Sequence, residues 1–201
     1  MSAPALAIED LRVSYGRRAV VRGLTLGALS GGSVTALVGP NAAGKSTLLR
    51  AIAGLVPATG EVRLGDENLL SMPRGRRAGL VGFMPQLLPS GIGLSVLETV
   101  LAALRVTSPA MGESALRARA VDILERLDAL YLALEPLDRL SGGQRQIAAL
   151  AQTLAPDPQL LLLDEPTSAL DLRHQFQIMR LVRELAATGR SVVVVLHDLE
   201  L

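Results

Sequence analysis

The sequence predicts an α/β fold with a mainly parallel sheet core, an antiparallel β part at the N-terminus and an inserted helical subdomain. Short apolar runs of strand length alternate along the chain with stretches of helical spacing, a pattern typical of parallel sheets covered by helices on both faces. The chain has 201 residues, 49% of them hydrophobic, and no cysteine. It is therefore long enough to bury an aliphatic core without disulfides.

Residues 1–85 are expected to hold the β part and the first half of the core. Leu6–Tyr15 and Val20–Leu29 have strand character, and Arg17-Arg18 forms the polar turn between them. Three further elements are expected here, namely a strand at Ser33–Val38, a helix at Lys45–Leu55 and a strand at Leu80–Met84.

Residues 86–140 form the expected helical subdomain, with helices at Val96–Leu104 and Glu113–Leu130. One face of the second helix carries the apolar residues Ala120, Ile123, Leu124 and Leu127. Residues 141–201 return to the core. Their expected elements are a helix at Gly142–Ala155, a strand at Gln159–Leu163, a helix at Asp171–Thr188 and a strand at Ser191–Leu196.

The charge balance and hydropathy narrow the class of partner. With 20 basic and 19 acidic residues the net charge is +1, which argues against a protein that binds nucleic acid by neutralising phosphates. No apolar run approaches the ~18–20 residues of a membrane span, and Met1–Ala7 lacks the features of a secretory signal. We therefore expect a cytoplasmic protein whose mean hydropathy of +0.38 indicates apolar surface that meets a partner.

A phosphate-binding loop is predicted between the third strand and the first helix. Gly39–Ser46 fits the pattern G-x-x-x-x-G-K-[ST] in the strand–helix context that this pattern requires. Glycines let successive backbone N–H groups point at one anion, and the helix adds its N-terminal dipole. Lys45, the one lysine beside 19 arginines, should reach the phosphates, and Ser46 should offer its hydroxyl to Mg²⁺. The candidate nucleotide contacts are Gly39, Pro40, Asn41, Ala42, Ala43, Gly44, Lys45, Ser46 and Thr47. The alternative is a glycine-rich turn that caps a helix.

Two carboxylates follow the apolar strand Leu160–Leu163. A carboxylate at the C-terminal end of a parallel strand points into the ligand crevice. Asp164 is placed to hold Mg²⁺, and Glu165 is placed to polarise the attacking water as a general base. The alternative is a pair of surface acids at a strand end.

The pentapeptide Leu140-Ser141-Gly142-Gly143-Gln144 begins a helix. Ser141 and Gln144 form a capping box, and a capped, glycine-rich helix start is itself an anion site. Together with the phosphate loop and the paired carboxylates, this segment resembles the signature of ATP-binding cassette (ABC) ATPases, a family of P-loop NTPases.

The resemblance extends along the whole chain. Tyr15 matches the aromatic residue that stacks on adenine, and Gln86 matches the glutamine that touches Mg²⁺ and water. Ser168 to Asp171 match the segment that crosses to the opposite subunit, and His197 matches the histidine that contacts the γ-phosphate. The alternatives are that Tyr15 is a plain strand residue, that Gln86 is a loop glutamine, and that Ser168 and Asp171 are helix caps. For His197 the alternative is a structural histidine.

The family's architecture implies the cofactors and partners. ATP and Mg²⁺ are bound between two subunits of a head-to-tail dimer, either a homodimer or a pair of related ATPases. The phosphate loop of one subunit faces Ser141–Gln144 of the other, so hydrolysis is coupled to opening and closing. The motion drives transmembrane permease subunits through the groove near Gln86, which implies a peripheral location on the inner face of the cell membrane.

Asp171–Gln175 and the surroundings of Leu140–Gln146 resemble importers of iron–siderophore complexes, haem and cobalamin, as does the stretch His197–Leu199. His174 is then either a family marker or an ordinary polar helix residue. The chain is expected to be the ATPase subunit of such an importer. The alternatives are another class of ABC importer or a soluble ABC ATPase of cluster assembly or repair.

The end of the chain and one loop residue depart from the family's pattern. Four residues follow His197, whereas family members continue for several tens. We expect a cassette cut just past its last catalytic residue, which leaves Ser191–Leu196 with an exposed edge or face. A nucleotide-binding module with little or no hydrolysis is therefore an alternative function. Ala42 stands where the family often has glycine, and its methyl group is tolerated if φ is negative.

Overall fold

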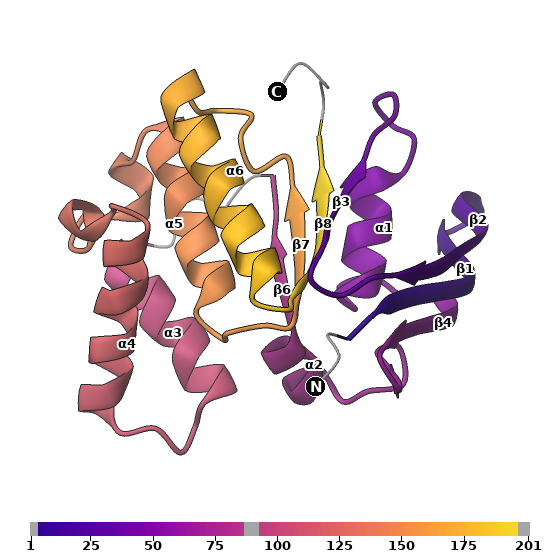
Figure 1. The fold of residues 1–201 in the computed structure, drawn as a ribbon, viewed down its shortest axis with the longest axis horizontal. Coiled ribbons are helices and arrows are strands. Elements are labelled where there is room, and N and C mark those ends of the chain that lie inside the picture. Colours follow the sequence, from indigo (N-terminus) through magenta and orange to yellow (C-terminus); the bar gives the residue numbers. More distant parts are fainter. Residues whose placement is uncertain (1–3, 87–92, 197–201) are drawn as a thin grey trace.

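The computed structural model describes residues 4–86 and 93–196. Within these residues the chain forms two four-stranded sheets with helices around them (Figure 1), which confirms the α/β prediction. The antiparallel sheet has the order β2-β1-β4-β5, and the parallel sheet has the order β3-β8-β7-β6. The strands are β1 Leu6–Tyr15, β2 Arg18–Leu29, β3 Val34–Leu37, β4 Thr59–Leu64, β5 Glu67–Asn68, β6 Val81–Met84, β7 Leu160–Asp164 and β8 Ser191–Val195.

The expected helices are present with small differences at their ends, and α2 is a helix that the sequence did not predict. The helices are α1 Lys45–Ile52, α2 Arg74–Leu80, α3 Val96–Thr107, α4 Glu113–Arg126, α5 Gly142–Leu154 and α6 Leu172–Ala187, with 3₁₀ turns η1 Leu130–Leu132 and η2 Leu137–Arg139. α4 ends before its predicted limit, because Asp128 adopts a φ of +52° that no right-handed helix accommodates. The first hairpin turns at Gly16 and Arg17, and Arg18 already belongs to β2.

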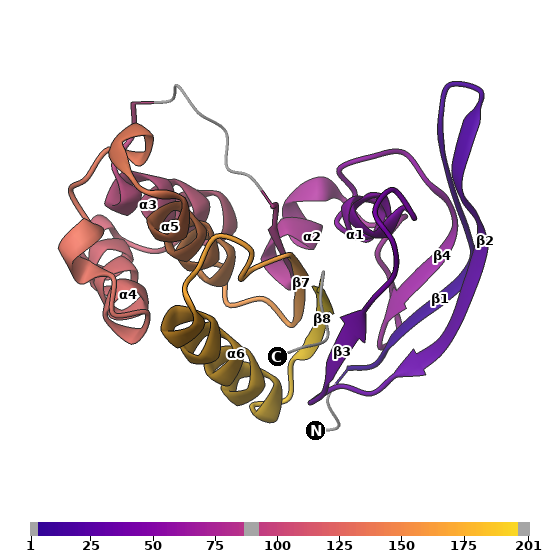
Figure 2. The same ribbon diagram turned by 90° about the horizontal axis from the view of Figure 1, so that it is seen from above.

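The parallel sheet separates two hydrophobic cores. Side chains alternate across a strand, so Leu161 and Leu163 of β7 pack with the core of α3 to α6, while Leu160 and Leu162 pack with α1 and the antiparallel sheet. α1 accordingly lies between the two sheets, and α5 and α6 cover the opposite face (Figures 1 and 2). This places the N-terminus of α1 close to the ends of β7 and β1.

The expectation of an exposed last strand is wrong. β8 lies between β3 and β7 and pairs with both, and all five of its residues are buried. Its backbone hydrogen bonds are therefore used on both sides, and helices cover its faces.

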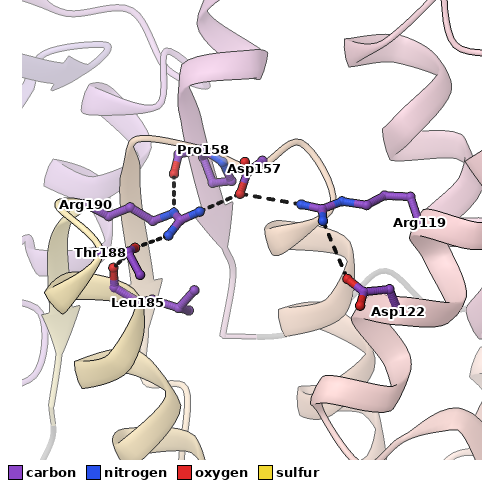
Figure 3. Close-up of polar contacts among 7 residues, drawn as sticks. All are labelled: Arg119, Asp122, Asp157, Pro158, Leu185, Thr188 and Arg190. Atoms are coloured by element: carbon purple, nitrogen blue, oxygen red, sulfur yellow. Dashed lines mark hydrogen bonds and ion pairs between the residues drawn. The ribbon is translucent and has the colours of Figure 1, made fainter.

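α3, α4 and the two 3₁₀ turns gather at one side of the molecule (Figure 1). Figure 3 shows how α4 is tied to the loops before β7 and β8. Arg190 Nη2 lies 2.5 Å from Asp157 Oδ1, and Arg119 Nη2 of α4 lies 3.5 Å from the same oxygen. Arg190 also donates to the carbonyl of Pro158, and Arg119 pairs with Asp122 on its own helix. One carboxylate thus joins two guanidinium groups from distant parts of the chain.

None of the helices in the described parts of the chain combines the length and the apolar character that crossing a membrane requires.

Candidate functional site

The phosphate loop connects β3 to α1 and lines an open cavity of about 680 Å³. α1 begins at Lys45 after Gly44, which has a φ of +94° and offers no side-chain cap. The first N–H groups of a helix lack intrahelical acceptors, so this uncapped start is a favourable place for an anion. Lys45 Nζ donates to the carbonyl oxygens of Gly39, at 2.5 Å, and Pro40, at 3.0 Å. The ammonium group is therefore held over the loop.

Ala42 adopts a φ of +62°. The condition that would make its methyl group tolerable, a negative φ, is therefore not met. The side chain is exposed, so contacts with neighbouring residues do not impose this conformation. The strain is in the backbone, because a Cβ atom in the left-handed region crowds the adjacent carbonyl.

Ser46 and Asp164 meet at the floor of the site. Ser46 Oγ donates to Asp164 Oδ1 at 3.1 Å, although the two residues are 118 positions apart. Asp164 ends β7 and is 1% exposed, and its second oxygen, Oδ2, is buried with no hydrogen-bond partner among the described residues. An orphaned buried carboxylate oxygen is costly unless a cation or water satisfies it. Hydroxyl and carboxylate oxygens are the ligands that Mg²⁺ prefers, so these residues fit that ion.

Gln86 and Glu165 lie at the same cavity. Gln86 follows β6, and its Nε2 donates to Glu165 Oε2 at 2.8 Å. Glu165 has a φ of +52°, a conformation that costs a non-glycine residue free energy and is found where the surrounding structure imposes it. The carboxylate thus stands beside the phosphate loop with one oxygen engaged by an amide.

Tyr15 closes the cavity on the side of the antiparallel sheet. It ends β1, its side chain is 47% exposed, and it lines the cavity together with the phosphate loop. Arg18 and Val20 of β2 also line the cavity, and sequence reasoning did not select them. Their only signal was their place beside the turn that follows Tyr15.

The Ser141–Gln144 segment lies elsewhere on the chain and does not line this cavity. The predicted capping box is present: Gln144 N donates to Ser141 Oγ at 3.3 Å, and Ser141 N donates to Gln144 Oε1 at 2.9 Å. A Cβ atom on Gly143 would lie 3.1 Å from the side chain of Leu170. This glycine therefore lets the loop before α6 pack against the start of α5.

Ser168 and Asp171 lie in that loop. Asp171 is the N-cap of α6, and its Oδ1 accepts from His174 N at 2.9 Å. This hydrogen bond holds the pKa of the Asp171 carboxyl below its usual range. Ser168 Oγ donates to the carbonyl of Glu165 at 3.2 Å. His197 lies outside the described residues.

Comparisons with known proteins agree with this geometry. The profile of the family described as ABC transporter matches residues 24–168, which is more than half of the chain. The chain belongs to the ABC transporter family. It therefore has the cassette fold of a P-loop NTPase, binds ATP and hydrolyses it.

Two similar relatives are named for import or transport. The chain is 40% identical to the hemin import ATP-binding protein HmuV of Shewanella denitrificans, over 96% of this chain and 78% of the relative. It is 35% identical to the achromobactin transport ATP-binding protein CbrD of Dickeya dadantii, over 98% of this chain and 74% of the relative.

Solved ABC structures share the fold. An inward-facing metal-chelate type ABC transporter matches with a TM-score of 0.78 at 33% identity, over 98% of this chain and 74% of that one. A dimeric bacterial ABC transporter cassette matches with a TM-score of 0.85 at 31% identity, over 96% of this chain and 88% of that one.

Proposed function

We propose that this ABC cassette powers the import of haem or a related iron complex. The observation that carries this proposal is the agreement among relatives: hemin import proteins from several bacteria are 37–42% identical to the chain over at least 90% of its length. Relatives named for achromobactin and petrobactin transport, which are 35–36% identical, support the same class of cargo.

The nucleotide is proposed to lie in the 680 Å³ cavity. Lys45 would exchange its two carbonyl partners for the β- and γ-phosphates, to which the uncapped amides of α1 also point. Tyr15 supplies an exposed ring at the far side of the cavity, where it can stack on adenine. The phosphate contacts would come from residues 39–47.

Mg²⁺ is proposed to accompany the nucleotide at Ser46, Asp164 and Gln86. The buried, unpartnered Oδ2 atom of Asp164 and the hydroxyl of Ser46 support this assignment. When bound, the ion would neutralise charge on the phosphate oxygens during phosphoryl transfer.

Glu165 is proposed as the general base for the attacking water, with His197 as a contact of the γ-phosphate. In the structure Gln86 occupies one oxygen of the Glu165 carboxylate. This hydrogen bond must be broken or redirected before that oxygen can accept a proton from water. Gln86 would therefore influence both the ion and the base.

We also propose that the active form is a head-to-tail dimer, peripheral on the inner face of the membrane through permease subunits. Ser141–Gln144 forms a capped, glycine-rich helix start whose first two residues are exposed, and it lies outside the cavity of its own chain. Both features suit a segment that contacts ATP bound to the opposite subunit. Ser168 and Asp171 are proposed to lie on the loop that crosses to that subunit.

The nucleotide site is tested by Lys45→Ala. We expect ATP affinity to fall by about tenfold or more, because a charge-assisted contact to phosphate is lost. Arg50→Ala on the exposed face of the same helix is the matched control, and its affinity should stay within about twofold. Titration with a fluorescent ATP analogue measures both. Equal affinity in the Lys45→Ala and wild-type proteins would contradict the site.

The cargo is tested with the cassette, its permease and its substrate-binding protein in proteoliposomes. Haem or a ferric siderophore complex should stimulate ATP hydrolysis and accumulate inside, whereas Zn²⁺ or an amino acid should do neither. Stimulation by Zn²⁺ or an amino acid alone would overturn the proposed cargo.

A further inference from the structure

Gln146 is a buried polar residue that sequence reasoning assigned to no role. It lies on α5, five positions after Ser141, and its side chain is 6% exposed. Its Nε2 donates to the carbonyl of Glu165 at 3.2 Å and to Ser168 Oγ at 2.9 Å, and its Oε1 accepts from Ala169 N at 3.1 Å. Both the Nε2 and the Oε1 atom of this amide are thus hydrogen-bonded to the loop that carries Glu165.

The backbone of Glu165 needs such support. Its φ of +52° is a strained conformation for a glutamate. Four hydrogen bonds from the described residues hold its peptide groups. Its N–H donates to Val195 O at 3.2 Å. Its carbonyl accepts from Gln146 Nε2 and from both the backbone N–H and the hydroxyl of Ser168. Of these partners, Gln146 alone belongs to α5. An apolar residue at that position would leave the carbonyl to Ser168 and would remove the connection to α5.

α5 begins with the Ser141–Gln144 segment, for which the proposed function gives a contact with ATP bound to the other subunit. Gln146 follows this segment by two residues on the same helix. A helix keeps its geometry over such a distance, so a shift of the α5 N-terminus moves the Gln146 amide and, through it, the carbonyl of Glu165.

We propose that Gln146 is a positioning residue that links the signature helix to the candidate general base of the same subunit. Contact of a nucleotide with Ser141–Gln144 would thereby be transmitted to Glu165, so that each site responds to the occupancy of the other. This inference rests on the proposed roles of Glu165 and Ser141–Gln144. Gln146 does not itself line the nucleotide cavity, so its expected effect is on kcat and not on nucleotide affinity.

Gln175 provides a matched control. It lies on α6 and is hydrogen-bonded to the same loop. Its Nε2 donates to Thr167 O at 3.2 Å and to Leu170 O at 2.9 Å. It makes no hydrogen bond to Glu165 among the described contacts. A variant at Gln175 therefore loosens the loop without removing the link between α5 and Glu165.

The test compares Gln146→Met, which keeps the length of the side chain, with Gln175→Met and the wild type. We expect Gln146→Met to lower kcat by about tenfold, while KM and ATP affinity stay within about twofold. Gln175→Met should keep kcat within about threefold of the wild type. Wild-type turnover that Glu165→Gln abolishes verifies the proposed role of Glu165 separately, so the failure of one proposal can be told from failure of the other.

A wild-type kcat in Gln146→Met would overturn the inference. An equal loss in both glutamine variants would also overturn it, because general loosening of the loop would then explain the effect. If Gln146→Met does not fold, Gln146→Glu carries the test with the same expectations. In its ionised form Glu keeps the acceptor for Ala169 N and loses the donor to Glu165.

Discussion

At the scale of single residues, the site combines side chains selected for chemistry with backbone that is strained to hold them. Ala42 and Glu165 both have positive φ values. Glu165 is held by hydrogen bonds with β8, with α5 and with Ser168 of the following loop, whereas Ala42 is exposed at the tip of the phosphate loop. A substitution at Ala42 can therefore relieve the backbone strain.

Ala42→Gly should stabilise the protein by about 1 kcal/mol, since glycine adopts a left-handed φ without the penalty of a Cβ atom. Ala43→Gly, at the neighbouring position, should destabilise it slightly through the greater entropy of the unfolded chain. Chemical denaturation of the three proteins measures the free energies of unfolding. A loss of stability in Ala42→Gly would show that the loop accommodates alanine without strain.

The motif residues were predictable one by one, because phosphate and Mg²⁺ chemistry restricts which side chains fit at each spacing. The phosphate loop and the pair Asp164 and Glu165 are examples. Gln146 was not predictable in this way. Its role depends on the path of a loop about twenty residues later in the chain, which no local pattern specifies.

At the scale of elements, local sequence signals placed most helices and strands correctly. The capping box at the start of α5 and the apolar run of β7 are short-range features that tertiary contacts do not override. β4, β5 and α2 were missed. β4 is stabilised by pairing with the distant β1, and the arginine-rich α2 shows no apolar stripe.

The ion pairs of Asp157 test the attachment of α4 to the rest of the chain (Figure 3). Asp157→Asn keeps a side chain that tolerates the φ of +56° at this position and removes only the charge. Because the carboxylate is 60% exposed, the expected loss is about 1 kcal/mol in the free energy of unfolding, and it should shrink in about 1 M salt.

Asp122→Asn is the control for Asp157→Asn, because within the described residues Asp122 pairs only with Arg119 of its own helix. Its effect should be smaller. If the two variants lose the same stability, the pairing between distant parts of the chain contributes nothing of its own.

The capping box of α3 gives a prediction about pH. The backbone N–H of Ser95 and then its hydroxyl hold the pKa of Glu98 below its usual range. A carboxyl with a lowered pKa stabilises the fold above its unfolded pKa, and this contribution disappears as pH falls through the folded pKa. Glu98→Ala should therefore lower Tm at pH 7 and have little effect well below about pH 3.

Glu125→Ala, on the exposed side of α4, should show no such pH-dependent difference. Thermal unfolding of the three proteins across this pH range provides the measurement. A Tm difference between Glu98→Ala and the wild type that persists unchanged at low pH would contradict the capping role of the carboxylate.

At the scale of the whole molecule, the two cores on either side of the parallel sheet bring distant motifs to one edge. The phosphate loop follows β3, Gln86 follows β6 and Glu165 follows β7, and all three line one cavity. This convergence was predictable because parallel strands present their C-terminal ends at the same side. The central position of β8 was not predictable, since it depends on pairing with β3, which is distant in sequence.

The central claim is that the cavity binds ATP and that Glu165 drives its hydrolysis. Steady-state release of phosphate by the wild type and by Glu165→Gln tests it most directly, with ATP affinity measured on the same samples. We predict that Glu165→Gln retains ATP affinity within about twofold and loses turnover by about a hundredfold or more, since the amide cannot accept a proton. Equal turnover in the two proteins would contradict the assignment of Glu165, and absence of turnover in the wild type would favour a module that binds nucleotide without hydrolysing it.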